Sequence, residues 1–136
     1  MRTEPSDIAK ARKRLNVIAA DDARAQRALI QELLSSIGHQ IRVAMNGAEA
    51  YCMACESPPD LLITDLEMPS CNGVDLIQAF RHAEDRRLRQ IPIIVCSSRG
   101  EVHSLTRALD FGATSFVTKP LHFRELKMAI ENLQPS

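Results

Sequence analysis

Short apolar runs alternate along the chain with stretches in which apolar residues recur at helical spacing. Each run is bounded by polar or turn-forming residues, which is typical of a buried strand. Because strands that read as nearly continuous apolar runs are covered on both faces, the pattern predicts a parallel sheet. The predicted strands are 15–20, 39–44, 61–64 leading into Asp65, 91–96 and 114–118.

The stretches between these runs predict amphipathic helices. In the first of them Ile30, Leu33, Leu34 and Ile37 follow the i, i+3, i+4, i+7 pattern, and Gly38 stands where a helix commonly ends. The predicted helices cover about residues 23–37, 46–56, 72–90, 101–111 and 121–133.

Five strands alternating with five helices predict an α/β fold with a doubly wound, five-stranded parallel sheet. We expect one domain over residues 14–136, preceded by a flexible basic extension at 1–13 that contains Lys10, Arg12 and Lys13. In such sheets, ligands bind beyond the carboxyl ends of the strands. Functional residues are therefore expected at that edge of the sheet.

Composition excludes few functions but favours a cytoplasmic protein. Lysine and arginine total 17, which equals the total of aspartate and glutamate, so the charge balance indicates neither nucleic acid nor a membrane surface as a partner. No apolar run approaches the ~20 residues of a membrane span, and residues 1–10 lack the apolar core of a signal peptide.

Cys52 and Cys55 form a C-x-x-C motif that raises the alternatives of zinc binding and redox chemistry. The pair lies inside a predicted helix, where Cβ atoms three residues apart are roughly 5–6 Å from each other. A disulfide needs about 3.5–4.5 Å, and no second Cys/His pair follows at zinc-finger spacing. We therefore expect free thiols.

Polar residues with catalytic potential directly follow the strands. Asp21 and Asp22 follow the first strand, Asp65 the third, Ser97 the fourth and Lys119 the fifth. Three carboxylates in one crevice repel one another, and Mg²⁺ would relieve that repulsion. A lysine and a hydroxyl facing the ion suit the oxygens of a transferring phosphoryl group. Asp65 is then a plausible nucleophile that forms an aspartyl phosphate.

Each of these residues has an ordinary alternative explanation. An aspartate after a strand is commonly a turn residue or a helix cap. Lys119-Pro120 reads as a strand end followed by a helix-starting proline, and Ser97 as a loop hydroxyl. The functional interpretation rests on the coincidence that all five residues fall at one edge of one sheet.

The sequence resembles the receiver domains of two-component response regulators over about residues 14–134. The resemblance implies the (βα)5 flavodoxin-like receiver fold and a phosphorylated signalling switch. Such a switch is not an enzyme, because it catalyses only its own phosphoryl transfer and autodephosphorylation. The matching segments are V-I-A-A-D-D ending at Asp22, L-L-I-T-D-L-E-M-P ending at Pro69, Asn72-Gly73, P-I-I-V-C-S-S from Pro92, and G-A-T-S-F-V-T-K-P ending at Pro120.

The resemblance assigns a role to each residue of the site. Asp65 would take a phosphoryl group from a histidine kinase or a histidine phosphotransfer protein. Asp22 and Asp65 would bind Mg²⁺ directly together with the main-chain carbonyl of Glu67, while Asp21 would act through water. Lys119 would pair with a phosphoryl oxygen.

The resemblance also implies how a signal leaves the site. Ser97 would be the switch hydroxyl, and Phe116 the aromatic residue that rotates into the space Ser97 vacates. The Lys119-Pro120 peptide would be cis, an isomer that proline makes accessible. The surface made by helix four, strand five and helix five, about residues 101–133, would contact a downstream protein, with no direct nucleic-acid contact.

Two other classes of function remain as alternatives. A pseudo-receiver would keep the fold as a protein-binding module without control by phosphorylation. An aspartate-nucleophile phosphatase of the haloacid dehalogenase type would carry D-x-D on the first strand and a cap region, whereas D-L-E here ends the third strand.

A further hypothesis is that Glu67 and Arg99 pair across the mouth of the site and obstruct the water that would hydrolyse the aspartyl phosphate. The alternative is two separately solvated side chains.

Overall fold

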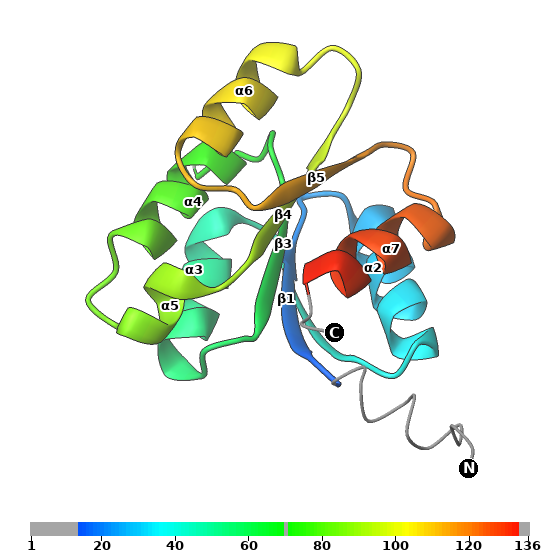
Figure 1. The fold of residues 1–136 in the computed structure, drawn as a ribbon, viewed down its shortest axis with the longest axis horizontal. Coiled ribbons are helices and arrows are strands. Elements are labelled where there is room, and N and C mark those ends of the chain that lie inside the picture. The colour runs from blue at the N-terminus through cyan, green and yellow to red at the C-terminus, as the bar shows by residue number, and fades with distance from the viewer. Residues whose placement is uncertain (1–13, 70, 134–136) are drawn as a thin grey trace.

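A single parallel sheet forms the centre of the molecule (Figure 1). The computed structural model describes residues 14–69 and 71–133, so the predicted extension at 1–13 lies outside the described residues. The strands are β1 (Asn16–Ala20), β2 (Gln40–Ala44), β3 (Leu61–Asp65), β4 (Ile93–Ser97) and β5 (Ser115–Thr118). Their order across the sheet is β2-β1-β3-β4-β5. The predicted doubly wound fold is confirmed.

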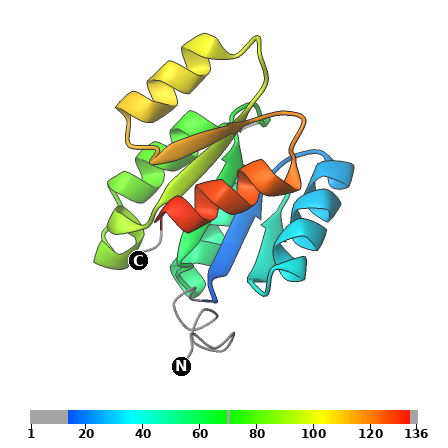
Figure 2. The same cartoon turned by 45° about the vertical axis from the view of Figure 1, so that its right-hand side comes forward.

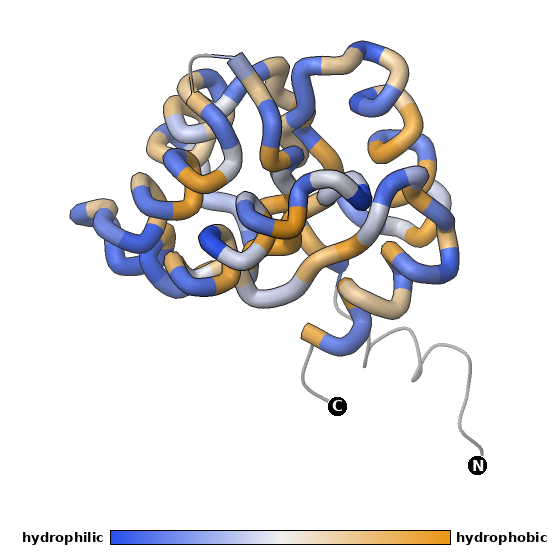
Figure 3. Tube along the Cα trace, turned by 90° about the horizontal axis from the view of Figure 1, so that it is seen from above, coloured by the Kyte–Doolittle hydropathy of each residue, from blue (hydrophilic) through white to orange (hydrophobic). Residues whose placement is uncertain are grey.

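Helices cover both faces of the sheet, and hydrophilic and hydrophobic positions alternate along them (Figure 3). Helices α2 and α7 lie on one face, and the other four lie on the opposite face (Figures 1 and 2). The helices are α2 (Arg24–Ser36), α3 (Gly47–Glu56), α4 (Gly73–Arg81), α5 (Arg86–Gln90), α6 (Val102–Asp110) and α7 (Phe123–Leu133).

The strand side chains divide the core into two layers. On β1, Val17 packs with the α2–α7 layer and Ile18 with the opposite layer, because successive side chains of a strand point to opposite faces. Leu34 of α2 and Ile130 of α7 are fully buried in the first layer, and Phe80 of α4 in the second. This double burial explains why the central strands β1, β3 and β4 read as nearly unbroken apolar runs.

The predicted single helix over 72–90 is wrong, because two helices occupy that segment. Helix α4 ends at Arg81, and α5 begins after Asp85, whose side chain accepts a hydrogen bond from the Arg87 N–H at 2.9 Å. An aspartate at this position supplies an N-cap, which starts a new helix and does not extend the preceding one. The next strand begins at Ile93 and not at 91, since Pro92 has no N–H to donate to the sheet.

Two further expectations are tested by the fold. All four cysteines are free, and Cys52 and Cys55 are both exposed on α3, so the prediction of free thiols is confirmed. In the part of the chain that the structure describes, no helix is long and apolar enough to cross a membrane.

Candidate functional site

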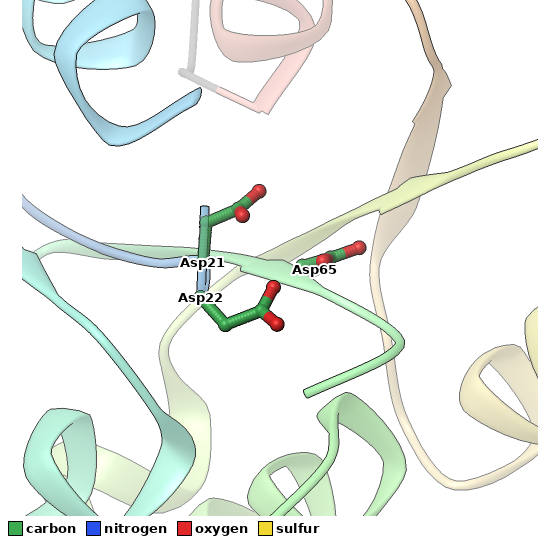
Figure 4. A group of neighbouring side chains, drawn as sticks. All are labelled: Asp21, Asp22 and Asp65. Carbon is green, nitrogen blue, oxygen red and sulfur yellow. The ribbon is translucent and has the colours of Figure 1, made fainter. Parts of the chain in front are cut away.

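Three aspartates meet at the carboxyl edge of the sheet. Asp21 and Asp22 directly follow β1, and Asp65 is the last residue of β3. Because β1 and β3 are parallel neighbours with Ala20 beside Thr64, their ends bring the three side chains together (Figure 4). One carboxylate oxygen from each lies within 4.8 Å of the others. The predicted acidic cluster is present.

Burial makes this cluster electrostatically unfavourable on its own. Asp21 is 1% exposed and Asp65 is 5% exposed, whereas Asp22 is open to solvent. Loss of hydration raises the pKa of Asp21 and of Asp65 above the ordinary value, and the charge of Asp21 raises the pKa of Asp65 further. The arrangement therefore favours the approach of a cation.

Lys119 supplies one positive charge to this cluster. Its Nζ lies 2.7 Å from Asp65 Oδ1 and 3.7 Å from Asp21 Oδ2. Although burial lowers the pKa of Lys119, the hydrogen bond with Asp65 and the charges of both aspartates raise it above the ordinary value. The amine is thus held as an ammonium group against the two buried carboxylates.

The donor set fits a small hard cation. Asp21 Oδ2 is buried and accepts no hydrogen bond, although Lys119 lies near it. Three carboxylates offset by one ammonium leave a net negative charge, and every ligand atom offered is oxygen. Oxygens within 4.8 Å of one another suit Mg²⁺, because ligands on opposite sides of that ion are roughly 4 Å apart.

Ser97 and Lys119 are joined through the main chain. Ser97 ends β4, is 3% exposed, and accepts a hydrogen bond on its carbonyl oxygen from the Lys119 N–H at 2.8 Å. The neighbouring Lys119–Pro120 peptide is cis, as predicted. The hydroxyl and the ammonium therefore come from adjacent strand ends at the edge that carries the aspartates.

The remaining predicted residues lie at the margin of the site. Phe116 on β5 is 45% exposed and so does not occupy the space beside Ser97. Glu67 and Arg99 are both exposed, and among the described residues no ion pair joins them. The predicted pair across the mouth of the site is not formed, which leaves the two side chains solvated separately.

Two contributors to the site were not identified from the sequence. A Cβ on Gly73 would lie 2.4 Å from the carbonyl oxygen of Asp65, so this glycine allows α4 to start against the main chain of Asp65. Asn72-Gly73 is visible in the sequence, but its contact with Asp65 is not. Glu101 accepts a hydrogen bond from the Ser98 N–H, and no local sequence signal distinguishes it from other acidic residues at helix starts.

Comparison with known proteins adds independent findings. The model of the response regulator receiver domain family matches residues 17–131. The chain is 32% identical over 119 residues to the response regulator MprA of Mycobacterium leprae, covering 88% of this chain and 50% of that protein. It is 34% identical over 117 residues to the sensor histidine kinase TmoS of Ectopseudomonas mendocina, covering 86% of this chain and 12% of that protein. The chain thus spans half or less of these relatives.

A solved structure supports the fold. The chemotaxis response regulator CheY4 of Vibrio cholerae superimposes with a TM-score of 0.81 at 23% identity, covering 89% of this chain and 99% of that one.

Proposed function

Because the chain belongs to the receiver domain family of response regulators, we propose that it is the phosphoacceptor of a two-component phosphorelay, phosphorylated on Asp65. One observation carries the proposal: the Asp65 carboxylate lies 2.7 Å from the Lys119 ammonium and within a cluster of three aspartates. Receiver domains take phosphoryl groups from histidine kinases, so a histidine kinase or a phosphotransfer protein is the proposed donor.

In the proposed reaction, an Asp65 carboxylate oxygen attacks the phosphorus of a phosphohistidine. The new P–O bond forms as the P–N bond breaks, and the electron pair leaves with the imidazole nitrogen, which takes up a proton. The Lys119 ammonium is already within hydrogen-bond distance of the attacking carboxylate of Asp65, where it would stabilise the charge on a phosphoryl oxygen.

Asp22, Asp65 and the main-chain carbonyl of Glu67 would hold Mg²⁺ directly, and Asp21 would hold it through water. When bound, the ion supplies positive charge against the phosphoryl oxygens. The chain's own contribution is to keep Asp21 and Asp65 buried and fixed, through the Asp21 Oδ1 bond to the Ala23 N–H at 2.9 Å and the Lys119 bond to Asp65.

The proposed output is a change in the surface formed by α6, β5 and α7. Ser97 would move its hydroxyl toward the phosphoryl group, and Phe116 would rotate inward from its exposed position. To convert a mostly inactive population into a mostly active one, phosphorylation must favour the active state by about 5 kcal/mol. A dianion held by an ammonium, a hydroxyl and Mg²⁺ is a sufficient source for that difference.

Exposed apolar side chains on this surface support protein–protein contact. Phe116 is 45% and Met128 60% exposed, and both line a groove of about 350 Å³ between β5 and α7. On α6, Val102 is 67% exposed. A downstream protein is therefore the proposed recipient of the signal, with no direct contact to nucleic acid.

The test is incubation with acetyl phosphate and Mg²⁺, followed by mass spectrometry of the intact protein. The parent chain should gain one phosphoryl group, and Asp65→Asn should gain none. Asp110→Asn is the matched control, because Asp110 is an exposed aspartate on α6, and this variant should behave as the parent. A parent chain that gains no phosphate would favour the pseudo-receiver alternative.

A further inference from the structure

Glu101 closes the turn that connects β4 to α6. The Ser98 N–H donates a hydrogen bond to Glu101 Oε1 at 2.5 Å, and the Glu101 N–H donates one to the Ser98 carbonyl at 3.1 Å. The side chain and the main chain of Glu101 thus both form a hydrogen bond with the main chain of Ser98. A bond from an N–H to a carboxylate is short and charge-assisted, which makes it stronger than a bond between neutral groups.

This turn directly follows the residue that carries the proposed switch hydroxyl. Ser98 directly follows Ser97, whose carbonyl is fixed by the Lys119 N–H at 2.8 Å. Within the turn, a Cβ on Gly100 would meet no atom within 4 Å, so packing at that position does not restrain the turn. The two hydrogen bonds between Ser98 and Glu101 therefore restrain the main chain beyond Ser97.

The Glu101 carboxylate is also close enough to sense charge on Asp65. Burial is the largest cause that raises the pKa of Asp65, and the negative charges of Asp21 and Glu101 raise it further, against the lowering effect of Lys119. The repulsion between the Glu101 carboxylate and the Asp65 carboxylate will grow when Asp65 carries a phosphoryl group, which has a charge of about −1.5 to −2 at neutral pH.

We propose that Glu101 is a positioning residue that latches the β4–α6 turn in the resting state and releases it when Asp65 is phosphorylated. The inference rests on the proposed phosphorylation of Asp65. The added negative charge repels the Glu101 carboxylate, the bond to the Ser98 N–H opens, and the main chain that carries Ser97 becomes free to shift. The same residue thus opposes activation before phosphorylation and transmits it afterwards.

Hydrogen exchange at the Ser98 amide, followed by NMR, tests the latch. In the resting protein Glu101→Ala should speed exchange of this amide by about tenfold or more, since a charge-assisted bond is lost. Glu101→Gln keeps an acceptor oxygen and should have a smaller effect. Glu125→Ala, which removes a glutamate from the first turn of α7, should leave the exchange rate unchanged.

Beryllofluoride with Mg²⁺, a mimic of the aspartyl phosphate, separates the charge effect from the hydrogen bond. In the parent chain the Ser98 amide should lose protection when the mimic binds, relative to the same chain with Mg²⁺ alone, because the ion's own charge is then present on both sides of the comparison. In Glu101→Gln it should stay protected, because a neutral amide is not repelled by the new charge.

Two results would overturn the latch. One is equal Ser98 exchange in the resting parent and Glu101→Ala; the other is unchanged protection in a parent chain whose Lys119 signals show that the mimic is bound. Failure of the parent chain to bind the mimic or to accept phosphate is a different result, which overturns the proposed function and the latch with it.

Discussion

Replacing Lys119 with methionine removes the ammonium that offsets the buried aspartates while keeping an unbranched side chain of similar length. The change leaves Asp65 and Asp21, 5% and 1% exposed, without the charge that lies 2.7 Å and 3.7 Å from their oxygens. Removing one partner of a fully buried ion pair costs roughly 3–5 kcal/mol. Because the Lys119 side chain is 24% exposed, solvent weakens the pair, and we expect a loss of about 2–3 kcal/mol.

Urea unfolding in a buffer with a chelator measures this loss without interference from Mg²⁺. The matched control is Lys127→Met, since Lys127 lies on the surface of α7 with its Nζ 5.9 Å from the centre of the Phe123 ring. An exposed cation–π contact is worth about 0.5–1 kcal/mol, so the control should lose far less stability.

The pH dependence has a definite sign. Lys119 lowers the pKa of Asp65 and of Asp21, both already raised by burial, so its removal raises these folded-state values further. A carboxyl group with a raised folded-state pKa destabilises the fold above that pKa, and the penalty disappears as pH falls toward 3.8, the ordinary pKa of an aspartate. The loss of unfolding free energy in Lys119→Met should therefore be largest near pH 7 and should shrink on acidification. A deficit equal to that of Lys127→Met, or one that grows toward acid pH, would refute the reasoning.

Three other predictions concern a glycine beside the site and two side chains that hold the main chain elsewhere in the fold. Arg81→Met should lower the free energy of unfolding by about 3 kcal/mol in urea titrations, because four hydrogen bonds from the half-buried guanidinium to main-chain carbonyls are lost. Gly73→Ala should reduce phosphorylation by acetyl phosphate and cost about 1–3 kcal/mol, because the new Cβ meets the Asp65 carbonyl at 2.4 Å; unchanged yield and stability would contradict this. His39 accepts a hydrogen bond from the Leu15 N–H, and burial lowers its pKa below 6.5. Stability should therefore fall as pH drops from 6.5 through that lowered pKa, and His39→Gln should remove this component of the urea-unfolding profile.

The fold was predictable because the sequence patterns that specify it, apolar runs alternating with helical spacing, are local and recur along the chain. The central strands β1, β3 and β4 are buried on both faces, so their apolar runs are continuous, and four of the five strands deliver chemically distinctive residues to the same edge. The alternation of strands and helices then places Asp22, Asp65 and Lys119 together without knowledge of any single contact. The boundary between α4 and α5 was missed because Asp85 acts as a cap within a stretch whose composition is otherwise helical.

Contacts that depend on side-chain direction were not predictable. Whether Glu67 and Arg99 pair is decided by rotamers of two exposed side chains, which residue spacing does not determine. The bond between Ser98 and Glu101 depends on the conformation of a short turn, and the approach of Gly73 to Asp65 depends on how α4 is seated on the sheet. The spacing of apolar residues predicts which face of a helix or strand a residue occupies. It does not predict the contacts of that residue, because these depend on how the elements pack in three dimensions.

The central claim is that the Asp65 carboxylate itself becomes the acyl phosphate. Borohydride reduces acyl phosphates but not free carboxylates, so treatment of the phosphorylated protein converts only a phosphorylated aspartate into homoserine. Peptide mass spectrometry should find homoserine at position 65 after incubation with acetyl phosphate and Mg²⁺, and aspartate there when the phosphodonor is omitted. Homoserine at another aspartate, or an unreduced Asp65 in protein that carries phosphate, would contradict the account.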